Sequence, residues 1–442
     1  MSAPESTVAA GGAVADIAKV GVLVFPAEAE NAFELFDALR YATRLRVWGA
    51  SSRPGYANLL FPRLKDDLPP ISDPGFLDAL NAFVAQAGIS LIFPTHDDVA
   101  LYLAAHAAQI RATVVGSDLA CAEVCREKRR LYQALAGEAF CPRVFGETDP
   151  VDEWPVFAKP NRGQGGVGAA RVGTPAELDR LRSAGADLVV SEFLPGEEFT
   201  VDCFSDRHGQ LRFAGPRSRD VVRMGIAFVS RVVPLDAQTQ QIAQALNERF
   251  RPRGLWFFQV KRDAGGRLKL LEMSCRVAGT MSVYRQLGVN LPLLAVFDAL
   301  GMDVQVLRND LPLTLRRRLQ SSYATDLTFD TVYVDYDDTV IVDGQVNAVL
   351  MQFLYECRNR GRRLVLLTKH AGDLAAHMRA FHIPESLFDR IDHLDAAQRK
   401  VDFITDRNAI LIDNLFAERR DAARHAGIAV FDVDAVPGLL GL

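Results

Sequence analysis

A lysine followed by a glycine-rich segment is the first pattern in this chain whose residue types indicate chemistry. In FAKPNRGQGGVG, residues 157–168, Lys159 precedes glycines at positions 163, 165, 166 and 168. Glycines let backbone amides approach a ligand closely, and a cation offsets the charge of phosphate oxygens. The GK[ST] ending of a Walker A loop is missing, and an ordinary hairpin turn is the alternative. The pattern favours a loop that binds a polyphosphate.

Two closely spaced aspartates follow an apolar run in VYVDYDDTV, residues 332–340. Asp335 stands where the apolar run ends, and Asp337 lies two positions further on. At the carboxyl end of a strand, an aspartate faces the crevice in which open α/β sheets bind ligands. A carboxylate there would attack or release a phosphoryl group. This pattern predicts phosphoryl chemistry at a second place in the chain, with simple strand capping as the alternative.

Further residues around the glycine-rich segment resemble the motifs of the ATP-grasp superfamily. In chain order they are Lys128 in a predicted helix, Lys159, SEFLPGEEFTVD at 191–202 and LLEMSCR at 270–276. The resemblance spans about residues 17–310 and is strongest for carbamoyl-phosphate-synthase-like and carboxylate–amine (peptide) ligase-like members. It implies that ATP is bound with Mg²⁺, or with Mn²⁺ in its place.

The resemblance assigns roles to individual residues. Lys128 and Lys159 would neutralise the α- and β-phosphates, and Arg276 would stabilise the phosphoryl group or the acyl-phosphate that follows. The other nucleotide contacts would come from the loop glycines Gly165 and Gly166, the adenine-binding backbone of Glu192, Phe193 and Leu194, Glu198 at the ribose, and Glu272. The implied metal ligands are Gln259, Glu272 and Ser274.

One of these residues departs from the family pattern. Glu-x-Asn-x-Arg is usual near the metal, whereas this chain reads Glu272-Met273-Ser274-Cys275-Arg276. Serine is a shorter ligand than asparagine, so we expect weaker binding of a second metal ion and not the loss of the site.

Several charged residues near the two patterns have two interpretations each. Arg219, Arg223 and Arg231 would bind a carboxylate substrate, or they would form a solvated basic face. His96-Asp97-Asp98 follows a predicted strand and is more typical of a helix cap than of a substrate contact. His370 would approach the aspartate site or lie on the surface.

The aspartate pattern has partners that resemble the haloacid-dehalogenase-like (HAD) superfamily over about residues 330–442. Thr368 ends LVLLT, Lys400 lies in DAAQRKVDF, and Asp413 ends AILID. By this resemblance Asp335 is the nucleophile and Asp337 the acid and base. Thr368 and Lys400 would hold phosphoryl oxygens. The implied Mg²⁺ ligands are Asp413, Asp335 and the Asp337 carbonyl.

Together the two resemblances predict a bifunctional enzyme. Its first part would activate a carboxylate as an acyl-phosphate and pass it to an amine, and its second part would hydrolyse a phosphate monoester. Two alternatives stay open: an ATP-grasp kinase or carbamoyl-phosphate-type synthase that forms no amide, and a nucleotide-binding sensor or scaffold without turnover. Short gaps between the HAD-like motifs predict a phosphatase part without a cap domain.

Three groups of elements must position these residues. Residues 17–120 alternate strand and helix patterns, which is typical of a parallel α/β sheet. Residues 329–442 repeat that rhythm with four predicted strands, and two successive helices are expected between residues 369 and 408. Residues 121–315 mix strands and helices as an α+β domain does, with a helix predicted over residues 121–137, a strand with alternating faces in FTVDCFSD (199–206) and a hairpin around Ala-Gly-Gly (264–266). Residues 316–328 form a linker, and 1–16 form a flexible tail. The predicted fold class is a multidomain α/β and α+β protein: a pre-ATP-grasp parallel sheet, an ATP-grasp domain and a capless HAD-like Rossmannoid sheet.

Composition excludes several classes of partner. A chain of 442 residues with net charge −5 and 49% apolar residues is typical of globular protein and carries no nucleic-acid footprint. No apolar stretch approaches the ~20 residues of a membrane helix. The six cysteines show no zinc spacing and indicate reduced thiols in a cytoplasmic protein. The expected partners are small molecules (a carboxylate, an amine and a phosphate monoester), and the ATP-grasp resemblance is consistent with a homodimer.

Overall fold

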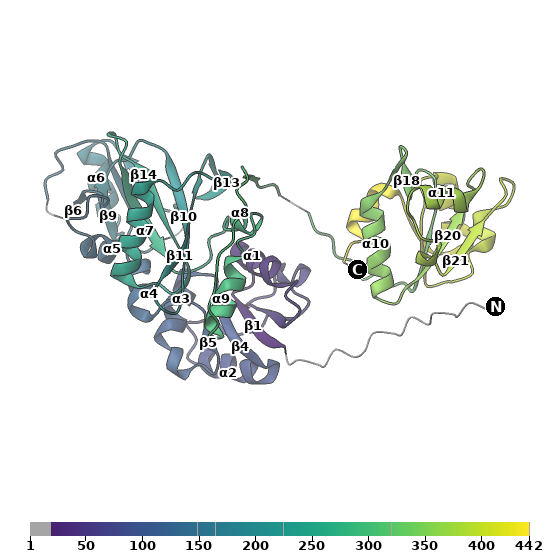
Figure 1. The fold of residues 1–442 in the computed structure, drawn as a ribbon, viewed down its shortest axis with the longest axis horizontal. Helices are drawn as coiled ribbons and strands as arrows, with labels where there is room; N and C mark the ends of the chain where they lie inside the picture. The colour runs from purple at the N-terminus through teal and green to yellow at the C-terminus, as the bar shows by residue number, and fades with distance from the viewer. Residues whose placement is uncertain (1–18, 148, 164, 224, 320, 442) are drawn as a thin grey trace, which may run out of the picture. The chain divides into compact units, whose positions relative to one another are not determined.

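The chain divides into two compact units, residues 1–318 and 319–442 (Figure 1). The computed structural model describes residues 19–441 except 148, 164, 224 and 320. The predicted tail, residues 1–16, lies outside the described residues. Each unit has hydrophobic cores of its own.

A five-stranded parallel sheet opens the first unit, in the order β3-β2-β1-β4-β5. Helices cover both of its faces, so β1 is apolar throughout: Val22 and Val24 pack with α1, whereas Leu23 and Phe25 pack with α2 and α3. All predicted strands and helices of this part are confirmed, and the short β3 is additional. Their bounds are β1 Val20–Phe25, α1 Glu30–Leu39, β2 Leu45–Ala50, β3 Leu64–Lys65, α2 Phe76–Ala87, β4 Ile89–Pro94, α3 Asp97–Ala105 and β5 Thr113–Val114.

The helix predicted over residues 121–137 is interrupted. The structure has α4 (Leu119–Arg126) and α5 (Lys128–Ala134), with Glu127 extended between them at φ −115° and ψ 103°. Asn161 causes the break, because its carbonyl accepts from the Lys128 amide at 3.2 Å and its side-chain oxygen accepts from the Arg129 amide at 2.9 Å. The Glu127 carboxylate pairs with Arg162. Lys128 therefore stands at the start of a helix and not within one.

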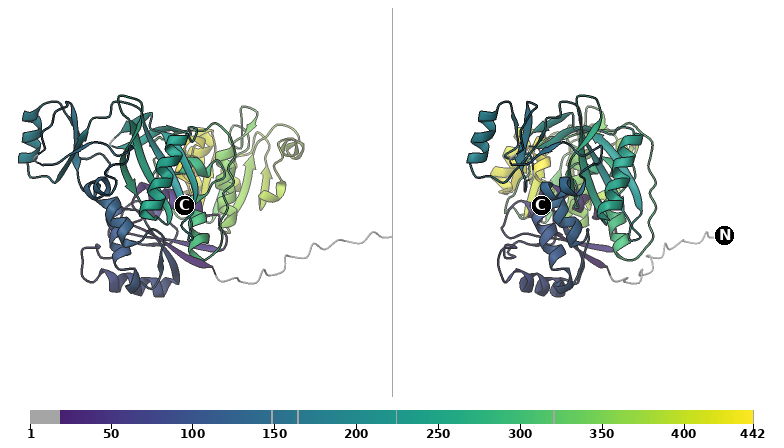
Figure 2. Two further views of the ribbon diagram at one scale, coloured as in Figure 1. Left: turned by 60° about the vertical axis from the view of Figure 1, so that its left-hand side comes forward. Right: turned by 90° about the vertical axis from the view of Figure 1, so that its left-hand side faces the viewer.

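A small antiparallel sheet, in the order β6-β9-β7-β8, carries the glycine-rich loop. The loop joins β7 to β8, and α6 covers one face of the sheet around Val156, Val172 and Leu178. Figure 2 shows that this sheet and α6 project from the rest of the first unit in both views. The bounds are β6 Val144–Phe145, β7 Val156–Pro160, β8 Ala170–Val172, α6 Pro175–Ser183 and β9 Leu188–Glu192.

A larger antiparallel sheet, in the order β11-β10-β14-β15, forms the centre of the first unit. One face is apolar and packs with α7, and the hairpin predicted around Ala-Gly-Gly joins β14 to β15. The helices α9 and α1 lie side by side (Figure 1). The bounds are β10 Glu198–Ser205, β11 Leu211–Ser218, β12 Val221–Arg223, β13 Ile226–Arg231, α7 Ala237–Phe250, β14 Gly254–Arg262, β15 Leu268–Ser274, α8 Ser282–Arg285, α9 Leu291–Ala299 and β16 Thr314–Arg316.

The segment between the units differs in part from the predicted linker, residues 316–328. β16 pairs with β13 and ends at Arg316, so this residue belongs to the first unit and not to the linker. Residues 321–329 form no helix or strand.

The second unit is a five-stranded parallel sheet in the order β21-β20-β17-β22-β23. Four of its strands were predicted, but two helices had been expected between residues 369 and 408, where α11 is followed by β21 and short 3₁₀ turns. β21 is a half-buried edge strand of polar composition, RIDH, and so lacks an apolar signal. The bounds are β17 Thr331–Val334, β18 Ile341–Val342, β19 Gln345–Val346, α10 Ala348–Asn359, β20 Arg363–Thr368, α11 Leu374–Ala380, β21 Arg390–His393, β22 Ala409–Ile412, α12 Phe416–Asp421 and β23 Ala429–Phe431.

No helix in the described part of the chain is both long and apolar enough to cross a membrane. Within residues 330–441, only the β18–β19 hairpin stands between β17 and α10, so nothing of domain size is inserted there.

Candidate active sites

A cavity of about 600 Å³ in the first unit brings most of the predicted nucleotide-binding residues together. Its walls come from the first parallel sheet, the small sheet with its glycine-rich loop, and the larger antiparallel sheet. The predicted residues that line it are Lys128, Lys159, Gly165, Gly166, Glu198, Gln259, Glu272, Ser274 and Arg276. We call it the phosphate cavity.

The larger sheet presents a row of polar side chains to this cavity. Thr200 pairs with Arg217 on one side and with Gln259 on the other, and Gln259 pairs with Glu272. Residues paired directly across antiparallel strands point to the same face, and all four line the phosphate cavity. We call these four residues the polar row. The alternating positions between them are apolar, as Val201 shows, and pack on the other face with α7.

The break between α4 and α5 brings Lys128 into the cavity. Its ammonium donates to the Gly163 carbonyl at 3.2 Å and lies 3.8 Å from Glu272 Oε2. The ammonium thus links the glycine-rich loop to the end of the polar row.

Lys159 reaches the cavity from β7 and is buried, with 7% of its surface exposed. Its ammonium donates to the Tyr132 hydroxyl and to the Leu271 carbonyl, both at 2.7 Å. Burial lowers the pKa of Lys159 to about 7, against the opposing effect of the Glu272 carboxylate and with a smaller lowering effect of Lys128. These partners carry no charge, so an anion such as a phosphate would stabilise the protonated lysine.

The glycine-rich loop is closed on one side by the turn between β12 and β13. A Cβ atom on Gly225 would lie 2.0 Å from the Gly165 carbonyl oxygen, so no other residue fits at Gly225 without displacing the loop. Gly165, Gly166 and Gly225 all have positive φ, at 62°, 70° and 75°. The loop conformation therefore depends on glycine in both segments.

Glu272 and Gln259 offer oxygen donors on adjacent strands, a donor set that suits Mg²⁺. Ser274 fits this role less well, because its hydroxyl hydrogen-bonds to Asp97 Oδ1 at 2.7 Å. Among the residues that the structure describes, no group of three or more His, Cys, Asp or Glu side chains could hold a metal ion. A metal in this cavity would therefore depend on Glu272, Gln259 and the phosphate oxygens of a nucleotide.

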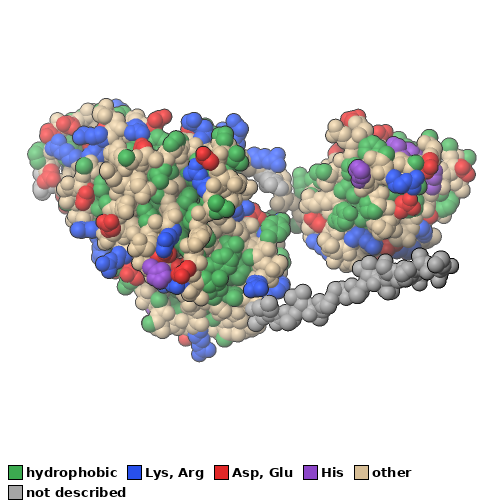
Figure 3. All heavy atoms as spheres, viewed as in Figure 1, with side chains coloured by type: hydrophobic (Ala, Val, Ile, Leu, Met, Phe, Trp, Pro, Cys, Tyr) green, Lys and Arg blue, Asp and Glu red, His purple; other side chains and the backbone are tan. Residues whose placement is uncertain are grey.

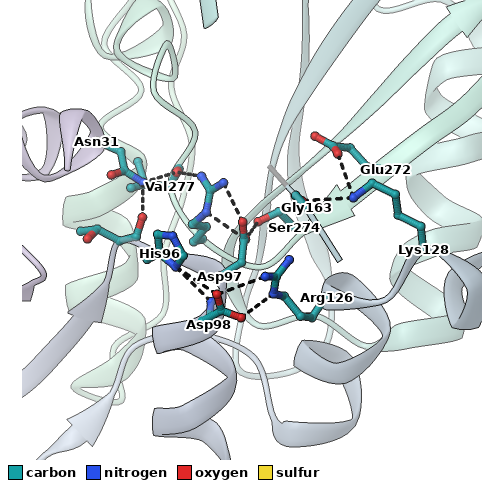
Figure 4. A network of polar contacts seen from close by, with 12 residues as sticks. Asn31, His96, Asp97, Asp98, Arg126, Lys128, Gly163, Glu272, Ser274 and Val277 are labelled. Carbon is teal, nitrogen blue, oxygen red and sulfur yellow. Dashed lines mark hydrogen bonds and ion pairs between the residues drawn. The ribbon is translucent and has the colours of Figure 1, made fainter. Parts of the chain in front are cut away.

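Asp97 binds both Ser274 and Arg276, and its contact with Ser274 can be followed in Figure 4. Arg276 donates through Nε and Nη2 to the two Asp97 oxygens, each at 2.9 Å. Burial alone would raise the pKa of Asp97, but the charge of Arg276 and the hydrogen bonds from Arg276 and Ser274 outweigh it and lower the pKa to about 2. His96 caps α3 as the sequence favoured, since its Nδ1 accepts from the Asp98 amide at 3.3 Å. The prediction that this segment caps a helix did not include the contacts of Asp97 with Arg276 and Ser274.

The predicted adenine-binding segment does not line the phosphate cavity. Glu192 accepts a hydrogen bond from the Arg143 amide at 2.9 Å, and this contact turns its side chain toward a different cavity of about 800 Å³. The Phe193 ring lies 5.3 Å from the guanidinium carbon of Arg171, and Leu194 is buried. These are side-chain contacts, whereas the prediction concerns the backbone of the segment, so adenine binding there stays a prediction.

The structure places the three arginines that had two interpretations in different surroundings. Arg219 lines the phosphate cavity, with Nε 2.6 Å from Glu198 Oε1. Arg231 is exposed and pairs with Asp220, and Arg223 lies exposed over the Phe228 ring. The basic-face interpretation holds for Arg223 and Arg231.

In the second unit, the ends of three parallel strands and a nearby turn gather Asp335, Thr368, Asp413 and Lys400. The Lys400 ammonium lies 2.7 Å from Asp335 Oδ1 and 2.6 Å from Asp413 Oδ2, with all three side chains buried. Burial raises the pKa of Asp335 to about 6 against the opposing effect of Lys400. Burial would lower the pKa of Lys400, but the two carboxylates outweigh it and raise that pKa.

Asp337 is exposed and Thr368 is fully buried, and both contact His370. The Asp337 carboxylate lies 2.9 and 3.0 Å from His370 Nδ1, and the Thr368 hydroxyl accepts from the His370 amide at 3.1 Å. The ring of His370 lies 4.7 Å from that of His377, and histidines gather on the visible face of the second unit (Figure 3). Of the two interpretations of His370, the structure favours the approach to the aspartate site.

Comparison with known proteins supports the ATP-grasp assignment. Residues 185–319 match a family described as ATP-grasp in the biosynthetic pathway with Ter operon. No curated protein sequence matches the chain. N5-carboxyaminoimidazole synthetase from Staphylococcus aureus, complexed with ADP, is similar in structure with a TM-score of 0.56 and 13% identity, over 68% of this chain and 82% of its own.

Two further structures are similar. L-amino acid ligase from Bacillus licheniformis has a TM-score of 0.51 and 18% identity, over 64% of this chain and 74% of its own. Rhizobium etli pyruvate carboxylase has a TM-score of 0.52 and 17% identity over 65% of this chain, which spans only 29% of the carboxylase. Identities this low show a shared fold alone. The family match covers residues 185–319, and the shared fold extends over about two thirds of the chain.

Proposed function

We propose that the first unit is an ATP-dependent ligase that activates a carboxylate as an acyl-phosphate and joins it to an amine. The observation that carries this proposal is the phosphate cavity, in which Lys128, Lys159 and Glu272 meet Arg276. Two lysines in one buried place have a use if a polyphosphate binds there, since without an anion Lys128 lowers the pKa of Lys159.

Each side chain has a task in this chemistry. Lys128 and Lys159 neutralise phosphate oxygens, and Arg276, held by Asp97, stabilises the charge on the phosphoryl group in transfer. Mg²⁺ held by Glu272 and Gln259 would supply further charge neutralisation on the phosphates.

ADP release tests the ligase proposal. Purified protein with ATP, Mg²⁺ and hydroxylamine as the amine is screened against the proteinogenic amino acids and short dicarboxylic acids, with formation of ADP and of the hydroxamate measured together. We expect both products with at least one carboxylate, and neither in Lys159→Ala. ADP without hydroxamate would favour a kinase, and absence of both would contradict the proposal.

We further propose that the second unit is a phosphatase of the HAD type, supported by the triad of Asp335, Lys400 and Asp413 at the strand ends. An Asp335 oxygen would attack phosphorus, the bond from phosphorus to the leaving oxygen would break, and Asp337 would give that oxygen a proton. Asp337 would then take a proton from the water that hydrolyses the aspartyl-phosphate. The two carboxylates of the triad are the residues that would hold Mg²⁺.

Hydrolysis of p-nitrophenyl phosphate with Mg²⁺ tests this second activity. We expect turnover by the purified protein and its loss in Asp335→Asn. If Asp335→Asn also lost ADP release in the ligase assay, the assignment of two separate sites would be wrong.

A further inference from the structure

The Arg217 end of the polar row contains two buried polar groups for which the ligase chemistry above has no task. Thr200 and Arg217 are each 1% exposed, and both line the phosphate cavity. Within the described part of the chain, neither Thr200 Oγ1 nor Arg217 Nη1 has a hydrogen-bond partner. Leaving buried polar groups unpaired costs free energy, so where such groups line a cavity a bound ligand can supply the missing partner.

The guanidinium of Arg217 is fixed in one orientation. Its Nε donates to Asp202 Oδ2 at 2.7 Å and its Nη2 to Asp202 Oδ1 at 3.1 Å, and Asp202 is fully buried. Because the guanidinium is planar and its Nε–Nη2 edge binds Asp202, Nη1 lies on the side away from Asp202. The orientation of the guanidinium is therefore set before any ligand binds.

The chemistry of the two groups selects the ligand. An arginine N–H can only donate, so it requires an acceptor and disfavours an ammonium group. Strands in a sheet lie about 4.8 Å apart, which puts Thr200 one strand from Gln259 and two from Glu272. An acceptor held here would lie beside phosphates bound near Glu272.

We propose that Arg217 Nη1 and the Thr200 hydroxyl bind the carboxylate that is activated, an inference that rests on the proposed ligase function. A free oxygen of the bound carboxylate attacks the terminal phosphorus of ATP, and the bond from that phosphorus to the bridging oxygen breaks, leaving its electron pair on ADP. The amine then displaces phosphate from the acyl group and gives up a proton.

The conservative variant Thr200→Val tests the subsite in the full chain. The assay is hydroxamate formation with the carboxylate that the wild type accepts, with the KM for carboxylate and the KM for ATP measured separately. We expect the KM for carboxylate to rise about tenfold or more, as the loss of one buried hydrogen bond predicts, with the KM for ATP unchanged. The melting temperature should stay the same or rise, because the hydroxyl has no partner in the protein.

Ser51→Ala is the matched control. Ser51 is also 1% exposed, its hydroxyl also lacks a partner among the described residues, and it does not line the phosphate cavity. Its removal should leave both KM values unchanged. Arg217→Lys, which lacks the planar fork, should raise the KM for carboxylate as Thr200→Val does.

Three outcomes would overturn the inference. An unchanged KM for carboxylate in Thr200→Val would show that the hydroxyl does not contact it. A rise in the KM for ATP alone would assign the two groups to the terminal phosphate. If the wild type forms no hydroxamate with any carboxylate, the ligase proposal itself fails and this inference fails with it.

Discussion

Lys159 and Lys400 are both buried, yet their surroundings move their pKa values in opposite directions. Lys159 donates to the Tyr132 hydroxyl and the Leu271 carbonyl, which are neutral, and burial lowers its pKa to about 7. Lys400 lies between the carboxylates of Asp335 and Asp413, and its pKa is raised. The protein thus supplies the countercharge of Lys400 itself, whereas a ligand must supply that of Lys159.

This contrast predicts proton uptake when a nucleotide binds. At pH 8 Lys159 is largely neutral, and phosphates beside it would favour its protonated form, so binding of ADP should take up roughly one proton. Calorimetric titration in two buffers of different ionisation enthalpy measures the uptake. It should disappear in Lys159→Met, and equal uptake in both proteins would contradict the assignment.

The same pKa shift fixes the sign of a pH effect on stability. Between pH 7 and the ordinary lysine value of 10.5, native Lys159 binds fewer protons than the unfolded chain does. Its contribution to the free energy of unfolding therefore becomes more favourable as the pH rises through this window. Urea unfolding followed by tryptophan fluorescence should show this rise in the wild type and a smaller one in Lys159→Met.

Replacing Lys400 should destabilise the second unit more than replacing Asp335, one of the two carboxylates that pair with it. Lys400→Met leaves two buried carboxylates without a cation, a change that costs about 3–5 kcal/mol. Asp335→Asn keeps the Lys400–Asp413 contact at 2.6 Å and should cost about 1–2 kcal/mol. Urea unfolding followed by circular dichroism compares the two variants, and equal losses would mean that the lysine is not the common partner.

At the scale of elements, the break between α4 and α5 positions Lys128, the cation that would meet the nucleotide in the proposed ligase. Asn161 accepts hydrogen bonds from the first two amides of α5, and Lys128 is the first residue of that helix. If α4 and α5 formed one continuous helix, the direction of the Lys128 side chain would follow from the helical turns of α4. Asn161 follows the strand that carries Lys159 and caps the helix that begins with Lys128. It therefore links the positions of the two lysines.

Asn161→Ala should weaken ADP binding as well as stability. Loss of a helix cap costs about 0.5–2 kcal/mol, and the freed start of α5 should raise the Kd for ADP severalfold. Asp236→Ala is the matched control, because Asp236 caps α7 by accepting from the Thr239 amide at 2.7 Å and does not line the phosphate cavity. The control should lose similar stability with no change in Kd, and similar Kd values in both variants would contradict the role of the break.

The helix break also shows what sequence patterns can and cannot predict. Strands such as β1 and β17 are apolar runs, and the parallel sheets that they form were predicted from that local signal. The break at Glu127 comes from Asn161, which lies 34 positions further along and has no local signal. The ladder that puts Thr200 beside Arg217 likewise depends on strand register. Alternating polar residues in FTVDCFSD showed that one face is polar, but not which residues it meets.

At the scale of the whole molecule, the two units have separate cores and one of them contains all the tryptophans. Trp48, Trp154 and Trp256 belong to residues 1–318, and the second unit has none. Tryptophan fluorescence therefore reports unfolding of the first unit alone, while circular dichroism reports both. Residues 321–329, which join the units, form no helix or strand.

This organisation predicts where a protease cleaves first. Tyr323 is 65% exposed in the joining segment, whereas Tyr355 and Phe416 are exposed on helices that must unfold locally before cleavage. Brief treatment with chymotrypsin should yield fragments 1–323 and 324–442, identified by mass spectrometry, and Tyr323→Ser should slow their appearance. Because each fragment keeps its own core, the first should retain ADP release and the second phosphatase activity. Loss of phosphatase activity on cleavage would mean that the second site depends on the first unit.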